Sequence, residues 1–119
     1  MAGKLTTHVL DTAQGRPAAG MVIELWAVDR LANQRTLLST TSTNSDGRTA
    51  SPLIEEELKV GVYELVFAVG DYFAQQPINS PAPPFLDLVP IRFGIADANA
   101  HYHVPLLTSP WAYSTYRGS

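Results

Sequence analysis

The chain has 119 residues, with 8 basic and 11 acidic side chains and a formal net charge of −3 at pH 7. Hydrophobic residues make up 45% and charged residues 16%, which predicts one packed domain over residues 1–119 and excludes a disordered chain. The charges are scattered and no apolar run approaches the ~20 residues that span a bilayer, so we expect neither a nucleic-acid nor a membrane partner.

Short segments rich in Val, Ile, Thr, Tyr and Trp alternate along the chain with turns that contain most of the 8 glycines and 9 prolines. This pattern predicts strands rather than helices. In chain order the predicted strands are Leu5–Asp11, Met21–Asp29, Thr36–Thr43, Gly61–Val69, Leu86–Ile95, Tyr102–Leu107 and Ala112–Tyr116. The start of the chain lacks the apolar run of a signal peptide, so a cytoplasmic protein is expected.

The segments between the strands predict turns and one helix. Asp46-Gly47 favours a tight turn, so Arg48 should lie just past it. A short helix is predicted over Asp71–Gln76, capped by Asp71 and ended by Pro77. The proline-rich stretch 78–84 should be an extended surface connection. Short strands at this spacing favour an all-β sandwich of two sheets.

Histidines on two predicted strands are the first candidates for chemistry, since the chain has no cysteine. Side chains alternate between the faces of a strand, so Thr6 and His8 should share one face of the first strand. By the same alternation His101 and His103 should share a face, opposite Tyr102. All three histidines of the chain could then lie on one surface, where a neutral imidazole can take a proton from water.

Other residues allow further interpretations. Arg48 is either a solvated turn residue or a fixed set of donors for a planar, electron-rich substrate. The His-x-His spacing with a third histidine could also hold zinc with an open position. The chain has no Gly-x-Ser-x-Gly elbow, no Gly-rich phosphate loop and no His-Glu-x-x-His motif. The acidic run 55–57 is best explained as a solvated loop.

Four segments of the sequence resemble the 5-hydroxyisourate hydrolases, also called transthyretin-related proteins. The last of them, which ends in Tyr-Arg-Gly-Ser, is the most specific. The segments are Leu5-Thr6-Thr7-His8-Val9-Leu10-Asp11 with Gly15-Arg16-Pro17-Ala18, Thr43-Asn44-Ser45-Asp46-Gly47-Arg48, His101-Tyr102-His103-Val104-Pro105-Leu106-Leu107, and Tyr113-Ser114-Thr115-Tyr116-Arg117-Gly118-Ser119. The resemblance covers nearly the whole chain.

The resemblance implies a transthyretin-like sandwich of two four-stranded antiparallel sheets with one short helix. It also implies a homotetramer, a dimer of dimers with its sites at the dimer-dimer interface. The implied reaction is hydrolysis of 5-hydroxyisourate to 2-oxo-4-hydroxy-4-carboxy-5-ureidoimidazoline in urate degradation, without a metal or other cofactor. By position, the catalytic residues would be His8, Arg48, His103 and Ser119. His8, Arg48 and Tyr116 would bind the substrate, and His101 is a weaker candidate.

Two alternatives from other classes stay open on the sequence. A carrier of the transthyretin type would bind a hydrophobic small molecule without chemistry, although it has no evident need of the histidines, Arg48 and the polar tail together. A hydrolase with zinc on the three histidines would lose its activity to a chelator.

Overall fold

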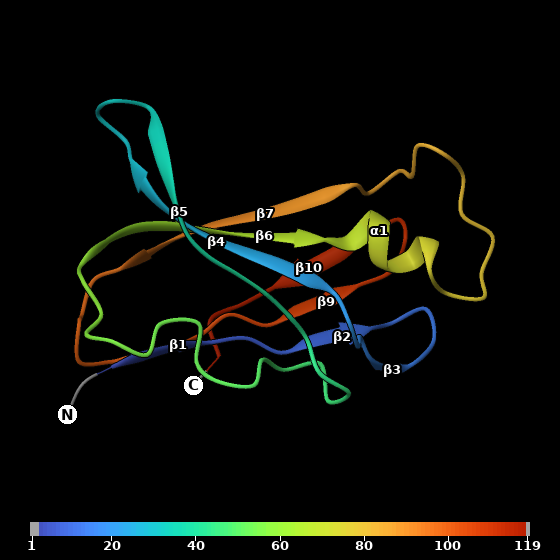
Figure 1. Cartoon of the computed structure of the whole chain (residues 1–119), viewed down its shortest axis with the longest axis horizontal. Helices are drawn as coiled ribbons and strands as arrows, with labels where there is room; N and C mark the ends of the chain where they lie inside the picture. The colour runs from blue at the N-terminus through green and yellow to red at the C-terminus, as the bar shows by residue number, and fades with distance from the viewer. Residues whose placement is uncertain (1–2, 119) are drawn as a thin grey trace.

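The structure, a computed structural model, describes residues 3–118 and is built mainly of strands (Figure 1). In chain order the elements are β1 (Lys4–Thr6), β2 (Val9–Asp11), β3 (Arg16–Pro17), β4 (Val22–Asp29), β5 (Gln34–Ser42), β6 (Gly61–Ala68), α1 (Val69–Ala74), β7 (Leu88–Ile95), β8 (His101–His103), β9 (Leu106–Thr108) and β10 (Tyr113–Thr115). They form two four-stranded sheets and a two-stranded pair. The predicted all-β fold with two four-stranded sheets and one short helix is confirmed.

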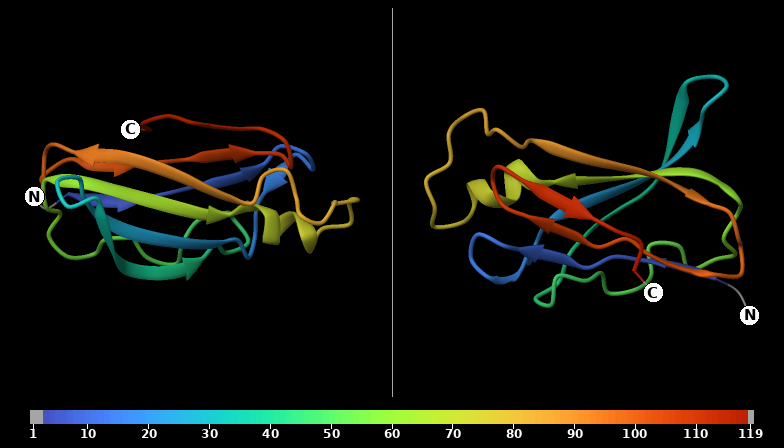
Figure 2. Two further views of the ribbon diagram at one scale, coloured as in Figure 1. Left: turned by 90° about the horizontal axis from the view of Figure 1, so that it is seen from above. Right: turned by 180° about the vertical axis from the view of Figure 1, so that it is seen from behind.

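The two sheets differ in the direction of their strands. One sheet has the order β5-β4-β6-β7 and is antiparallel throughout. The other has the order β10-β9-β2-β3, and its central pair, β2 with β9, is parallel. The pair β1 with β8 is parallel as well. The second sheet is therefore mixed rather than purely antiparallel, because strands from the two ends of the chain run side by side in the same direction (Figures 1 and 2).

Two predicted strands are each interrupted at the same level of the sheet. Leu5–Asp11 is divided into β1 and β2, and Tyr102–Leu107 into β8 and β9. At the interruption Pro105 has no N–H to donate, and the Thr7 hydroxyl donates to the Val104 carbonyl at 2.6 Å. The Val104 N–H donates to the Thr6 carbonyl and the Leu106 N–H to the His8 carbonyl, so hydrogen bonding continues between the halves.

Helix α1 begins two residues before the predicted start, and Asp71 lies in its first turn instead of capping it. The residue at the cap is Ala68, which supplies no side-chain hydrogen bond. Strand β6 runs directly into the helix, and the Gly70 N–H donates to the Asp87 carbonyl at 2.9 Å, so the helix start is held by backbone. No helix within residues 3–118 is long and apolar enough to cross a membrane.

The hydrophobic core lies between the sheets, because the buried side chains come from both. They include Leu5, Val9 and Leu106 from the strands at the chain ends, and Ile23, Leu25, Leu65, Phe67 and Val89 from the antiparallel sheet. All of these are at most 1% exposed. Their burial fixes which face of β1 and β2 points inward, and thereby which side chains remain outside.

A buried carboxylate joins the end of β2 to helix α1. Asp11 is fully buried and accepts the backbone N–H groups of Ala13 and Gln14 at 3.0 and 2.9 Å. It also accepts the Tyr72 hydroxyl at 2.8 Å. Burial and the neighbouring Asp11 carboxylate raise the pKa of Tyr72 well above its ordinary value, so the phenol remains a proton donor to that carboxylate.

We expect Tyr72→Phe to lower the free energy of unfolding by about 1.5 kcal/mol, because the buried Asp11 carboxylate loses the hydrogen bond that the Tyr72 hydroxyl donates to it. Urea unfolding followed by circular dichroism measures the change. Tyr113→Phe is the matched control, since Tyr113 is 45% exposed, and should change stability by less than about 0.5 kcal/mol. Equal effects of the two substitutions would contradict the role given to Tyr72.

Candidate active site

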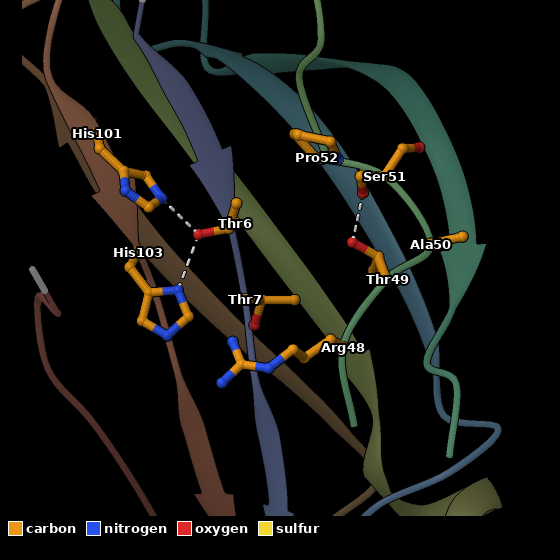
Figure 3. Close-up of a pocket in the computed structure, with 9 residues that line it drawn as sticks. All are labelled: Thr6, Thr7, Arg48, Thr49, Ala50, Ser51, Pro52, His101 and His103. Carbon is orange, nitrogen blue, oxygen red and sulfur yellow. Dashed lines mark hydrogen bonds between the residues drawn. The ribbon is translucent and has the colours of Figure 1, made fainter. Parts of the chain in front are cut away.

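A cleft of about 400 Å³ lies between the strand pair β1–β8 and the segment that follows β5 (Figure 3). Polar side chains dominate its walls. The lining residues are Thr6, Thr7, Arg48, Thr49, Ala50, Ser51, Pro52, His101 and His103. Figure 3 shows the two histidines on one side, the segment 49–52 on the other, and Arg48 reaching between them.

The predicted alternation of faces is confirmed on both strands. Thr6 and His8 are half-buried, whereas their neighbours Leu5, Thr7 and Val9 are buried in the core. On β8, His101 is exposed and His103 half-buried, whereas Tyr102 between them is buried. The register of the parallel pair sets Thr6 directly beside His103. The polar side chains of both strands therefore meet on the outer face.

The Thr6 hydroxyl lies between the two histidines of β8. Its Oγ1 is 2.7 Å from His101 Nε2 and 2.8 Å from His103 Nδ1, and both contacts are hydrogen bonds (Figure 3). The ring centres of the histidines are 6.2 Å apart. Because Nδ1 of His103 is bound to Thr6, its Nε2 is the ring atom left for a substrate or water.

The ring of His8 is held by the turn that precedes Arg48. His8 Nε2 lies 2.8 Å from the backbone carbonyl oxygen of Asp46. A carbonyl only accepts hydrogen bonds, so Nε2 carries the proton and Nδ1 is the remaining ring atom.

The turn that carries Arg48 is fixed at several points. The Asn44 N–H donates to the Arg48 carbonyl at 2.7 Å, and the Asn44 side chain accepts from the N–H groups of Asp46 and Arg48. Gly47 has φ 76°, and a Cβ there would overlap the Val9 carbonyl oxygen. The predicted position of Arg48 just past a turn is confirmed. Within residues 3–118 its guanidinium forms no ion pair.

The electrostatics of the cleft favour a neutral imidazole on His103. Burial lowers the pKa of His103 below 6.5, and the positive charge of Arg48 lowers it further. The neighbouring His101 and His8 act in the same direction. At neutral pH His103 is therefore available to accept a proton, which fits a general base.

The described part of the C-terminal tail lies against β8. The Gly118 N–H donates to the His103 carbonyl at 2.8 Å, and the guanidinium carbon of Arg117 is 4.3 Å from the centre of the Tyr102 ring. Ser119 lies outside the described residues. Tyr116 is 61% exposed and lines a separate hollow of about 360 Å³, so within one chain the structure does not bring it together with the histidines.

Thr6 is the site residue that the sequence did not single out. Its alternation with His8 put it on the same face, but an aliphatic hydroxyl has no chemistry of its own to draw notice. Only the pairing of β1 with β8 shows that it contacts two imidazoles. Thr49 and Ser51 on the opposite wall of the cleft were not singled out by the sequence either. Within residues 3–118 no three His, Asp or Glu side chains are grouped as metal ligands.

Comparison with known proteins gives a family. The sequence model of the HIUase/Transthyretin family matches residues 5–118. A protein of Rhizobium meliloti (strain 1021), named 5-hydroxyisourate hydrolase 2, is 58% identical over 98% of this chain and 97% of its own length.

Two solved structures are similar. The 5-hydroxyisourate hydrolase of Klebsiella pneumoniae superposes with a TM-score of 0.81 at 32% identity, over 98% of this chain and 99% of that one. Sea bream transthyretin in complex with thyroxine superposes with a TM-score of 0.85 at 24% identity, over 97% and 94% of the two chains. The second likeness concerns the fold alone.

We expect Gly118→Ala to disturb His103, because the added Cβ would lie 2.6 Å from Cδ2 of that ring. The side-chain resonances of His103 in an NMR spectrum should shift, while global stability falls by no more than about 1 kcal/mol because the tail lies at the surface. Gly94→Ala is the matched control, since a Cβ at Gly94 has nothing within 4 Å. Unchanged His103 resonances in Gly118→Ala would show that the tail does not rest on the ring.

Proposed function

The chain belongs to the HIUase/Transthyretin family, and we propose from this membership that it hydrolyses 5-hydroxyisourate to 2-oxo-4-hydroxy-4-carboxy-5-ureidoimidazoline, a step of urate degradation. The observation that carries the proposal is that His103, Arg48 and His101 line the same cleft. The chain that carries them is 58% identical to a 5-hydroxyisourate hydrolase. The reaction is attack of water on a ring carbonyl followed by cleavage of the carbon–nitrogen bond.

His103 is the proposed general base. Its Nε2 takes a proton from water while the water oxygen bonds to the substrate carbonyl carbon. The lowered pKa of His103 supports this role, because the ring is neutral and its lone pair available at neutral pH. When the carbon–nitrogen bond breaks, the departing ring nitrogen takes up a proton, so that one water is consumed and no charge is left on the product's nitrogen.

Arg48 is proposed to bind the oxygens of the substrate and to stabilise the negative charge that develops on the attacked carbonyl oxygen. Its backbone is held by the turn to Asn44, so the guanidinium is carried on a rigid base. It forms no ion pair among the described residues, so its donors are not taken by a carboxylate there.

His8 and Ser119 complete the proposed catalytic set. His8 would act through Nδ1, as a second acid–base group that contacts the substrate, because its Nε2–H is bound to the Asp46 carbonyl. Ser119 would orient the water or the substrate through its hydroxyl or terminal carboxylate. Tyr116 is proposed to contact the substrate from the hollow that it lines.

A homotetramer with sites at the dimer-dimer interface is part of the proposal. The cleft is open on the outer face of β1 and β8, and a second subunit over it would exclude water and strengthen the charges inside. Tyr116 and the histidines lie in different hollows of one chain, and an interface that covers both would let a subunit complete its neighbour's site. The proposed location is the cytoplasm, with which a cysteine-free chain is compatible.

The direct test generates 5-hydroxyisourate from urate with urate oxidase and follows its ultraviolet decay. The wild-type protein should accelerate the decay, with or without a chelator. His103→Ala should lower kcat by about 10²-fold or more while the fold persists, since general base catalysis contributes that much. Acceleration lost to the chelator would support a zinc hydrolase instead. No acceleration by the folded wild type would favour a carrier of the transthyretin type.

The pH dependence of kcat/KM should report His103. Its lowered pKa keeps the ring neutral to lower pH, so activity should fall on the acid side at a pH below 6.5. Arg48→Gln removes one cause of the lowering, so the residual activity should fall at a higher pH than in the wild type. Arg30→Gln, an exposed arginine that does not line the cleft, is the control and should leave the midpoint in place. If the acid-side midpoint of kcat/KM is the same in Arg48→Gln as in the wild type, His103 is not the group that sets it.

A further inference from the structure

The hydroxyl of Thr6 contacts two imidazoles of the cleft and has no role in the reaction proposed above. It joins the rings of His101 and His103 by hydrogen bonds of 2.7 and 2.8 Å. Both contacts run over the outer face of two adjacent parallel strands, whose register sets Thr6 beside His103. The three side chains therefore form a continuous chain of hydrogen bonds along the cleft, from the half-buried ring of His103 to the exposed ring of His101.

The protons in this chain can be counted. A hydroxyl has one proton to donate and can accept another hydrogen bond, and a neutral imidazole has one N–H. Thr6 must therefore donate to one histidine and accept from the other. In the first arrangement His103 donates Nδ1–H to Thr6, and Thr6 donates to Nε2 of His101. In the second arrangement every proton is shifted, and His101 donates to Thr6, which donates to His103.

Only the first arrangement leaves His103 able to act as a base. There Nδ1 of His103 carries the proton, so the lone pair is on Nε2, the ring atom not bound to Thr6. In the second arrangement Nε2 carries the proton and the ring can donate but not accept. The tautomer of His103 thus depends on the direction in which the Thr6 hydroxyl points.

Charge favours passing a proton outward along the chain. His103 is half-buried and near the positive charge of Arg48, which opposes a second positive charge on its ring. His101 is exposed, so a charge on its ring is stabilised by water. Arg48, His101 and His103 are the titratable groups that line the cleft, and His8 is a further titratable neighbour of His103.

We infer that Thr6 is a positioning residue, whose hydroxyl fixes His103 with Nε2 free and passes a proton between His103 and the exposed His101. This inference rests on the proposed hydrolysis. When Nε2 of His103 takes a proton from water, Nδ1 gives its proton to Thr6, and Thr6 gives its own to Nε2 of His101. His103 is then neutral again, and His101 holds the charge. The reverse transfer lets His103 protonate the departing nitrogen, so the protons balance over one turnover.

Two substitutions of Thr6 separate the hydroxyl from the shape of the side chain. Thr6→Val keeps the branched shape without the hydroxyl, and kcat should fall at least about ten-fold with KM changed less than about three-fold, because an acid–base step is impaired rather than binding. Thr6→Ser keeps the hydroxyl and should recover most of the lost kcat. Thr40→Val, on β5 and outside the cleft, is the control and should behave as the wild type. Full kcat in a folded Thr6→Val protein would overturn the inference.

The effect of His101→Ala on kcat, alone and combined with Thr6→Val, is a second test. If His101 acts through Thr6, His101→Ala and Thr6→Val should lower kcat by similar factors, and the double variant should lose little more than either single one. Losses that multiply in the double variant would mean that the two residues act independently, which contradicts a shared proton path.

A readout without substrate keeps this inference apart from the proposed reaction. The ¹⁵N chemical shifts of the imidazoles report which ring nitrogen carries the proton. In the wild type His103 should show the Nδ1–H tautomer as its main neutral form, and Thr6→Val should shift it to a mixture. The same tautomer mixture in both proteins would overturn the inference even if the hydrolysis is found. Conversely, a wild type that fails to hydrolyse 5-hydroxyisourate disproves the proposed function whatever the tautomers.

Discussion

The parallel pairing of the two ends of the chain is the constraint on which the site depends. Strand β1 pairs with β8 and β2 pairs with β9, so residues about 97 positions apart in the sequence become neighbours. Closing so long a loop costs conformational entropy, which the buried side chains of the same strands must offset. Leu5, Val9 and Leu106 lie in the core, and this inward anchoring turns Thr6 and His103 outward together. Packing of one face thus assembles the chemistry on the other.

The segment that carries Arg48 and the far wall of the cleft is bonded to the other edge of the N-terminal strands. The Val9 N–H donates to the Gly47 carbonyl at 2.8 Å, and the Leu53 N–H donates to the Leu5 carbonyl at the same distance. The segment between them carries Arg48 and the far wall of the cleft. Residues 5–9 therefore stand between two separate segments, each fixed to them by backbone hydrogen bonds. Both walls of the cleft are thus fixed to the same short stretch of chain.

The sequence predicted those features that depend on one segment alone. Alternation placed His8 and the β8 histidines outward because a period of two holds wherever one face of a strand is buried. The Asp-Gly turn before Arg48 followed from the need for a positive φ at Gly47. The parallel direction of β2 and β9 was not predicted, because it is decided by packing between distant segments. The helix start was misplaced by two residues because backbone from another segment, at Asp87, replaces a side-chain cap.

The fold does not by itself distinguish a carrier from a hydrolase, since sea bream transthyretin shares it at 24% identity. The distinction lies in what the outer face of β1 and β8 presents. A hydrophobic ligand is bound by apolar surface, whereas the cleft here has a cation, two imidazoles and several hydroxyls. A guanidinium that forms no ion pair within residues 3–118 works against binding of an apolar molecule, and its charge lowers the pKa of the half-buried His103. An arrangement that opposes charge on a histidine while leaving its proton a path to solvent suits proton transfer more than storage of a ligand.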